Sequence, residues 1–170
     1  KKEFFSDSAV ENIAKANKAL KTYYKELENI PTEIEKAKKA LEEQEATLDS
    51  LTQKRDALAA KDRSLSFSKG ERTKKISSKE VEQESLASKM SNLESKGIKK
   101  SSTEYTILAS QYNTITQEIR KLKTESANLD SAMARNKANI AKLDSQIDSS
   151  KTSISQLKQE ISQMSQKLNA

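Results

Sequence analysis

The sequence predicts an all-α fold: an elongated coiled coil, in the form of an antiparallel helical hairpin with a short helix and loops at its tip. Of the 170 residues, 34% are hydrophobic and 33% are charged, which are low and high values for a globular domain. Two glycines and one proline cannot supply the turns of a compact domain with many elements. Apolar residues recur at alternating spacings of three and four, a regularity that disordered chains of similar composition lack.

The first helical arm is predicted for residues 1–62. Two rows of apolar residues follow each other there with a seven-residue repeat, which places them along one face of a helix. Pro31 interrupts the repeat without shifting its phase, which favours a kinked helix. The alternative is a turn, after which Thr32 and Glu35 cap a new helix. The candidate seam residues of this arm are Leu20, Leu27, Ile34, Leu41 and Leu48.

The middle of the chain, residues 63–101, is basic and rich in serine, and it is predicted to form the tip. Residues 63–77 contain Gly70 and no recognisable heptad, so a loop is expected there, followed by a short helix over residues 78–96. Gly97 stands where a helix C-terminal cap belongs. Ser101 and Glu104 have the spacing of a capping box and predict the start of the next helix.

The second helical arm is predicted for residues 102–170. Its heptad pattern is nearly unbroken from Tyr105 to Leu168, without proline or glycine. A strict seven-residue repeat predicts a left-handed supercoil. The candidate seam residues of this arm are Ile119, Leu122, Leu129, Asn136, Ile140, Leu143, Ile147, Ile154, Leu157 and Ile161.

Two arrangements bury these seams. In the hairpin, the first arm packs antiparallel on the second, and the break in the middle of the chain is the turn between them. In the alternative, the second arm forms a parallel coiled-coil oligomer with copies of itself, because Ile in one row and Leu in the other favour parallel dimers. The two are compatible, since a hairpin can also form a homo-oligomer. A buried Asn136 would set the register of either.

The net charge of +6 is concentrated in the middle of the chain, where residues 63–100 carry 10 basic and 5 acidic groups. A hairpin would gather this excess at its tip, as a candidate contact for an anionic surface such as a membrane, a cell-wall polymer or a nucleic acid. The competing interpretation is an ordinary solvated loop. Nucleic acid is the weaker choice, because no aromatic-rich binding module accompanies the charge. The candidate tip contacts are Arg63, Lys69, Arg72, Lys74, Lys75, Lys99 and Lys100.

No catalytic, cofactor-binding or metal-binding motif is recognisable. The chain has no His and no Cys, which removes the commonest general base and the thiolate ligands. The stretch FSKGERTKK lacks the glycine spacing of a phosphate-binding loop. No apolar run approaches the roughly 20 residues of a membrane-spanning helix. We therefore expect no enzyme activity, no cofactor, no small-molecule substrate and no transmembrane segment.

These observations predict a non-enzymatic structural protein. Its expected role is that of a rigid spacer, scaffold or assembly subunit, with proteins, including copies of itself, as partners. One alternative is a binding module whose basic hairpin tip docks on an anionic surface. Another is a regulatory coiled-coil arm of a larger protein.

Overall fold

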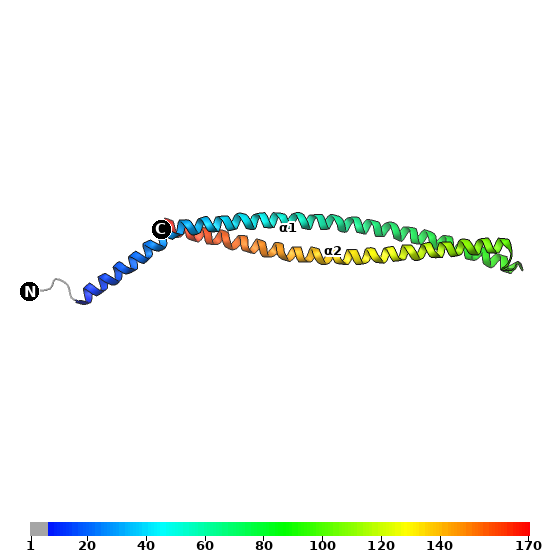
Figure 1. Ribbon diagram of the computed structural model, residues 1–170, viewed down its shortest axis with the longest axis horizontal. Coiled ribbons are helices and arrows are strands. Elements are labelled where there is room, and N and C mark those ends of the chain that lie inside the picture. The colour runs from blue at the N-terminus through cyan, green and yellow to red at the C-terminus, as the bar shows by residue number, and fades with distance from the viewer. Residues whose placement is uncertain (1–6) are drawn as a thin grey trace, which may run out of the picture. The chain divides into compact units, whose positions relative to one another are not determined.

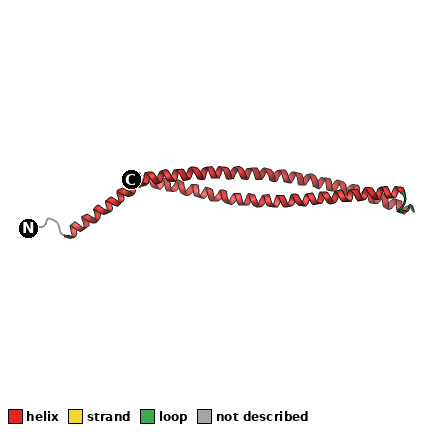
Figure 2. Ribbon diagram, viewed as in Figure 1, coloured by secondary structure: helices red, strands yellow, loops and turns green. Residues whose placement is uncertain are grey.

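The computed structural model describes residues 7–170, which form two long helices (Figure 1). Helix α1 spans Asp7–Ser95 and helix α2 spans Thr103–Asn169. Figure 2 shows helix along both segments and no strand in the described part of the chain. The predicted all-α class is therefore confirmed, while the first six positions of the arm predicted for residues 1–62 lie outside the described residues.

The two helices pack against each other as an antiparallel hairpin, within two compact units. One unit consists of Lys1–Gln53 and Ser145–Ala170, and the other of Lys54–Asp144. Each unit pairs a stretch of α1 with a stretch of α2, and the second unit contains the turn. Within this chain α1 covers the seam of α2, as the predicted hairpin requires.

The core of each unit is a narrow stripe along the facing sides of α1 and α2. In the first unit the buried side chains, Ser150 included, recur every three or four residues, as an amphipathic helix requires. In the second unit the burial is less complete, and only two apolar side chains and one polar side chain are buried. The buried side chains are Ile30, Ile34, Ala37, Ile147, Ser150 and Ile154 in the first unit, and Leu86, Ile119 and Asn136 in the second.

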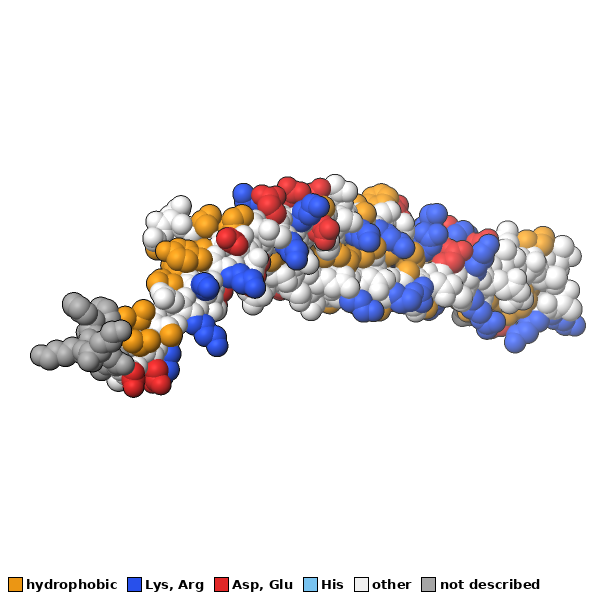
Figure 3. Space-filling view, turned by 60° about the vertical axis from the view of Figure 1, so that its left-hand side comes forward, with side chains coloured by type: hydrophobic (Ala, Val, Ile, Leu, Met, Phe, Trp, Pro, Cys, Tyr) orange, Lys and Arg blue, Asp and Glu red, His pale blue; other side chains and the backbone are white. Residues whose placement is uncertain are grey.

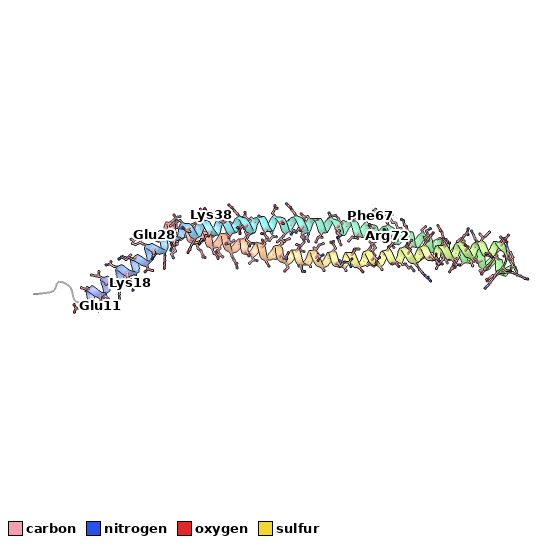
Figure 4. All side chains as sticks on the ribbon, in the orientation of Figure 1. Glu11, Lys18, Glu28, Lys38, Phe67 and Arg72 are labelled. Atoms are coloured by element: carbon pink, nitrogen blue, oxygen red, sulfur yellow. The ribbon has the colours of Figure 1, made fainter. Side chains whose placement is uncertain are left out.

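Helix α1 runs through Pro31 without interruption. Proline has no N–H to donate to the carbonyl of Leu27, and its ring crowds the preceding turn, so a proline in a helix interior produces a bend. Figure 4 shows α1 bending close to the labelled Glu28. The alternative of a turn with a new helix capped by Thr32 is wrong, because the helix is continuous there.

Helix α1 also continues through residues 63–77, so the predicted loop is wrong, and the predicted short helix 78–96 is the end of α1. The heptad phase persists through this stretch, but charged residues occupy part of the seam. Leu58, Leu65, Arg72, Lys79 and Leu86 follow one another at seven-residue steps, and all are buried or partly buried. The heptad is not recognised when only apolar residues are considered, because Arg72 and Lys79 occupy two of its positions. The single Gly70 costs the helix only about 1 kcal/mol relative to alanine, too little to end it.

The turn after α1 is a Schellman motif at Gly97, as the sequence predicts. Gly97 has φ of 78°, in the left-handed region that favours glycine. Its N–H donates to the carbonyl of Glu94 at 3.0 Å, and the N–H of Ile98 donates to the carbonyl of Leu93 at 3.0 Å. Two carbonyls at the end of α1 thus receive partners that the helix itself cannot supply.

Helix α2 is capped one position later than the sequence suggests. Ser102 is the capping residue, because its Oγ accepts a hydrogen bond from the N–H of Tyr105 at 3.2 Å. The predicted capping box of Ser101 with Glu104 is therefore wrong, because the cap is the next residue, Ser102. Glu104 instead lies in the first turn of α2, where a negative charge interacts favourably with the helix dipole.

The two glycines make a matched pair for testing this turn. We expect Gly97→Ala to lower the free energy of unfolding by about 1 to 2 kcal/mol, because an alanine at this φ adopts a left-handed conformation. We expect Gly70→Ala to raise it by about 0.5 to 1 kcal/mol, because position 70 is helical and nothing lies within 4 Å of an added Cβ. Urea unfolding followed by circular dichroism measures both, and equal effects of the two substitutions would contradict the turn assignment.

Candidate interaction surfaces

The basic residues predicted for the tip do not gather at one end of the helix pair. Arg63 and Lys75 lie inside α1, whereas Lys99 and Lys100 lie in the turn that follows it. Twenty residues of helix separate Lys75 from the end of α1, a distance of about 30 Å. The prediction of a single basic tip is therefore wrong, because the loop that would have brought the two groups together is a helix.

Two of these basic side chains, Lys69 and Arg72, instead reach across to acidic side chains of α2, as does the neighbouring Lys79. Arg72 Nε lies 3.1 Å from Glu125 Oε2, and Lys79 Nζ lies 2.8 Å from Glu118 Oε2. In Figure 4 the labelled Arg72 lies on the side of α1 toward α2, whereas Phe67, 70% exposed, lies on the outer side. We call the following contacts the cross-helix polar pairs: Arg55–Asp144, Lys69–Asp130, Arg72–Glu125, Lys79–Glu118 and Gln83–Thr116.

The cross-helix polar pairs keep a constant register. Lys69 lies fourteen residues after Arg55, and Asp130 lies fourteen residues before Asp144. One further step of fourteen on each helix leads to Gln83 Nε2, which donates to Thr116 Oγ1 at 2.8 Å. These α1 residues occupy the seam, whereas their partners flank the seam of α2, so that the α2 seam itself remains apolar at Ile119, Leu122 and Leu129.

The carboxylates of these pairs stabilise the charged form of their partners. The hydrogen bond from Arg55 to Asp144, followed by the charge of that carboxylate, raises the pKa of Arg55. Glu118 raises the pKa of Lys79 in the same way. Because all these side chains are substantially exposed, each pair adds little to stability. Their larger effect is on specificity, since a shifted register would place like charges side by side.

The most deeply buried polar side chain of the hairpin is Asn136, which is 3% exposed. Its Nδ2 donates to the backbone carbonyl of Leu58 at 2.8 Å. A buried amide without a partner costs free energy, so this contact disfavours other registers of the two helices. In the other unit, Ser150 Oγ lies 3.3 Å from Gln44 Oε1 and forms a second polar layer. Asp62 lacks such compensation, because its buried Oδ1 has no hydrogen-bond partner in the described residues.

The remaining basic candidates form no ion pair across to α2. Lys74 Nζ lies 3.6 Å from Glu71 Oε1 on the same helix, and Lys100 Nζ lies 3.6 Å from Glu94 Oε1 near the turn. Arg63, Lys75 and Lys99 form no ion pair with the part of the chain that the structure describes. A contact between the turn lysines and an anionic surface stays a prediction, now for a smaller charged group.

Next to the turn, two open grooves run between α1 and α2. The larger has a volume of about 600 Å³ and is lined by Val81, Leu86 and Ile115 together with polar side chains. The smaller, of about 390 Å³, includes Leu93 and the 53% exposed Ile107. Within residues 7–170 no group of acidic side chains is placed to hold a metal ion. None of the helices described is long and apolar enough to cross a membrane.

The predicted seam residues are buried or partly buried, with one exception. Leu20 is 49% exposed, because α2 does not extend alongside it. Sequence reasoning missed the acidic partners of the cross-helix polar pairs, although their spacing carries a signal. Glu118 and Glu125 lie seven residues apart, as do Lys79 and Arg72 on α1.

Comparisons with protein families, with curated proteins and with solved structures found no match to this chain.

A double-mutant cycle tests the cross-helix polar pairs. We expect Arg72→Ala and Glu125→Ala to show a coupling of about 0.5 kcal/mol in the free energy of unfolding, because the two helices must pair for these charges to meet. A matched cycle on Glu71 and Lys74, which are neighbours on one helix, should show a smaller coupling. Both couplings should decrease in high salt. A larger coupling in the control cycle would contradict the assigned register.

Tyr105 offers a test at the turn end of the hairpin. Its Oη donates to Glu94 Oε1 at 2.9 Å, and this hydrogen bond raises the pKa of the phenol above its ordinary value of about 10. The hydrogen bond stabilises the fold fully below pH 10 and is lost as the pH rises through the folded-state pKa. The absorbance titration of tyrosinate, compared with that of Tyr105→Phe, isolates this group. We expect Glu94→Gln to lower the pKa, and Glu84→Gln, a control farther along α1, to leave it unchanged.

Proposed function

We propose that this protein is a non-enzymatic coiled-coil module that acts as a rigid spacer or scaffold in a protein assembly. The observation that carries the proposal is the constant register of the cross-helix polar pairs. Arg55–Asp144, Lys69–Asp130 and Gln83–Thr116 repeat over 28 residues without a slip on either helix.

This repeat supports a supercoil for a geometric reason. The face of a straight α-helix drifts by about 20° per heptad relative to a seven-residue repeat. Over four heptads the drift would carry the last pair about 80° away from the facing helix. Contacts that recur at the same heptad positions are expected when the two helices wind around each other.

The proposed role follows from what such a pair provides. Its core is a stripe one helix wide, so it encloses little volume in which substrate chemistry is sheltered from water. What it supplies is a length fixed by the number of heptads and a surface rich in charge. Proteins are the expected partners, and no cofactor is proposed.

Measuring a distance along α1 tests the spacer directly. The chain has no cysteine, so Asp56→Cys and Ser91→Cys introduce two unique attachment sites for spin labels on one face of α1. Five heptads separate them, and we expect a narrow distance distribution centred at about 52 Å. A broad distribution at shorter distances would contradict a rigid spacer.

Matched deletions test the coiled coil itself. Removal of residues 62–68 together with residues 131–137 takes one heptad from each helix and preserves the phase of the flanking polar pairs. We expect the fold to persist and the distance between the labels to fall by about 10 Å. Removal of residues 64–68 with residues 131–135 serves as the control, because five residues rotate the seam by about 140°. Equal loss of helix content and stability in both variants would refute the coiled coil.

A further inference from the structure

The start of α1 presents a seam that no part of the described chain covers. Close to the end of α2, Lys167 Nζ lies 3.9 Å from Glu26 Oε2 of α1, and α2 ends at Asn169. The heptad row of α1 nevertheless extends toward its N-terminus through Tyr23, Leu20, Ala16 and Ile13. All four are exposed, Leu20 by 49% and Ile13 by 51%.

The side chains that flank this row are uncharged, unlike those in the paired part of the helix. The flanking positions hold Val10, Asn12, Asn17, Ala19 and Tyr24, of which Val10 is 54% and Tyr24 is 60% exposed. Figure 3 shows hydrophobic side chains gathered at the start of α1, next to the grey atoms. We call the row together with Val10 and Tyr24 the N-terminal face.

The paired part of α1 has a different border. There the flanking positions include Glu33, Lys38 and Glu45, which remain in water beside α2. Charges at these positions of a coiled coil select its partner. A border without charge imposes no repulsion between two identical helices, so the N-terminal face is compatible with a second copy of itself.

We propose that the N-terminal faces of two copies of this chain pair with each other in antiparallel orientation. The proposal deepens the assembly role proposed above by naming the partner. Its seam is continuous with the interface between α1 and α2, in the same heptad phase, so the same packing geometry extends into the contact between copies. Pairing also stabilises this stretch of about three heptads, because most of the stability of a helix in a protein comes from the packing of its apolar face.

The side-chain sizes determine the orientation. When the two helices cross at Lys18, an antiparallel pair places Ala16 opposite Leu20 of the partner subunit, and Ile13 opposite Tyr23 of the partner subunit. Each layer then combines a smaller side chain with a larger one, which keeps the separation of the helices even. A parallel pair would set Ala16 against Ala16 of the partner subunit and Tyr23 against Tyr23 of the partner subunit. The alanine layer would be much smaller than the tyrosine layer, so the parallel pair would leave unfilled space at the alanines, which close packing disfavours.

The solution mass of the full chain tests the pairing. We expect light scattering over a hundredfold concentration range to approach twice the 19.0 kDa mass of one chain. The double variant Ile13→Gln with Leu20→Gln should remain at the mass of one chain, because glutamine preserves helix propensity while removing the apolar contact. The control, Lys18→Gln with Lys25→Gln, changes the outer side of the same stretch and should still dimerise. A monomeric unmodified chain, or a dimer that survives the seam variant, would overturn the proposal.

Disulfide trapping tests the orientation. In the antiparallel register Val10 lies beside Tyr24 of the partner subunit, whereas a parallel pair separates these positions by about 21 Å. A mixture of Val10→Cys chains and Tyr24→Cys chains should therefore yield the mixed disulfide under mild oxidation. A predominance of the two homodimeric disulfides would indicate parallel pairing and would overturn the register.

This proposal rests on the proposed spacer function, and a combination of the measurements above distinguishes the failure of one from the failure of the other. The spin-label distance along α1 reports the hairpin of each chain and does not depend on a second copy. If the chain is monomeric but keeps the expected distance between labels 35 residues apart, the spacer proposal stands and only the self-association is refuted. Loss of that spacing in the seam variant would mean that the substitutions damaged the hairpin, in which case the disulfide test on chains with an intact seam decides.

Discussion

The structure depends on keeping one stripe of each helix in phase with the other. A helix pair has no interior apart from this stripe. If the apolar row of either helix shifted by one or two residues in sequence, its side chains would therefore point toward water. The burial of Ile34, Ile119 and Ile154 follows from that phase. So does the continuity of α1 through Pro31 and Gly70, because packing along the whole stripe outweighs the local cost of either residue.

The polar residues of the seam add specificity at little gain in stability. Leu and Ile pack acceptably in several registers, whereas Asn136 requires the carbonyl of Leu58, and Lys79 requires Glu118. Charge is therefore concentrated where the apolar seam is weakest, in the unit that contains the turn. Part of the positive charge in the middle of the chain, at Lys69, Arg72 and Lys79, is the α1 side of these contacts, with its counter-charges on α2.

The exposed seam at the start of α1 has the opposite character. It is apolar, bordered by neutral side chains and free of the polar groups that bind α1 to α2. The hairpin and the N-terminal face are thus built from one heptad pattern with two kinds of border. A charged border suits the intramolecular partner, and an uncharged one suits an identical partner in our proposal.

The sequence alone determined the helical class, the two arms, most seam residues and the cap at Gly97, because each depends on spacing or on the conformational freedom of a single residue. It did not reveal that residues 63–77 are helical. Arg72 and Lys79 appear as surface charges until their carboxylates, about fifty and forty residues away along the chain, are seen beside them. Only the tertiary structure decided that Lys69 and Arg72 contact α2 and do not belong to a basic tip, and that α2 leaves the seam around Leu20 uncovered. The reason is physical: local pattern specifies which face of a helix is apolar, whereas the identity and extent of its partner depend on the register between distant segments.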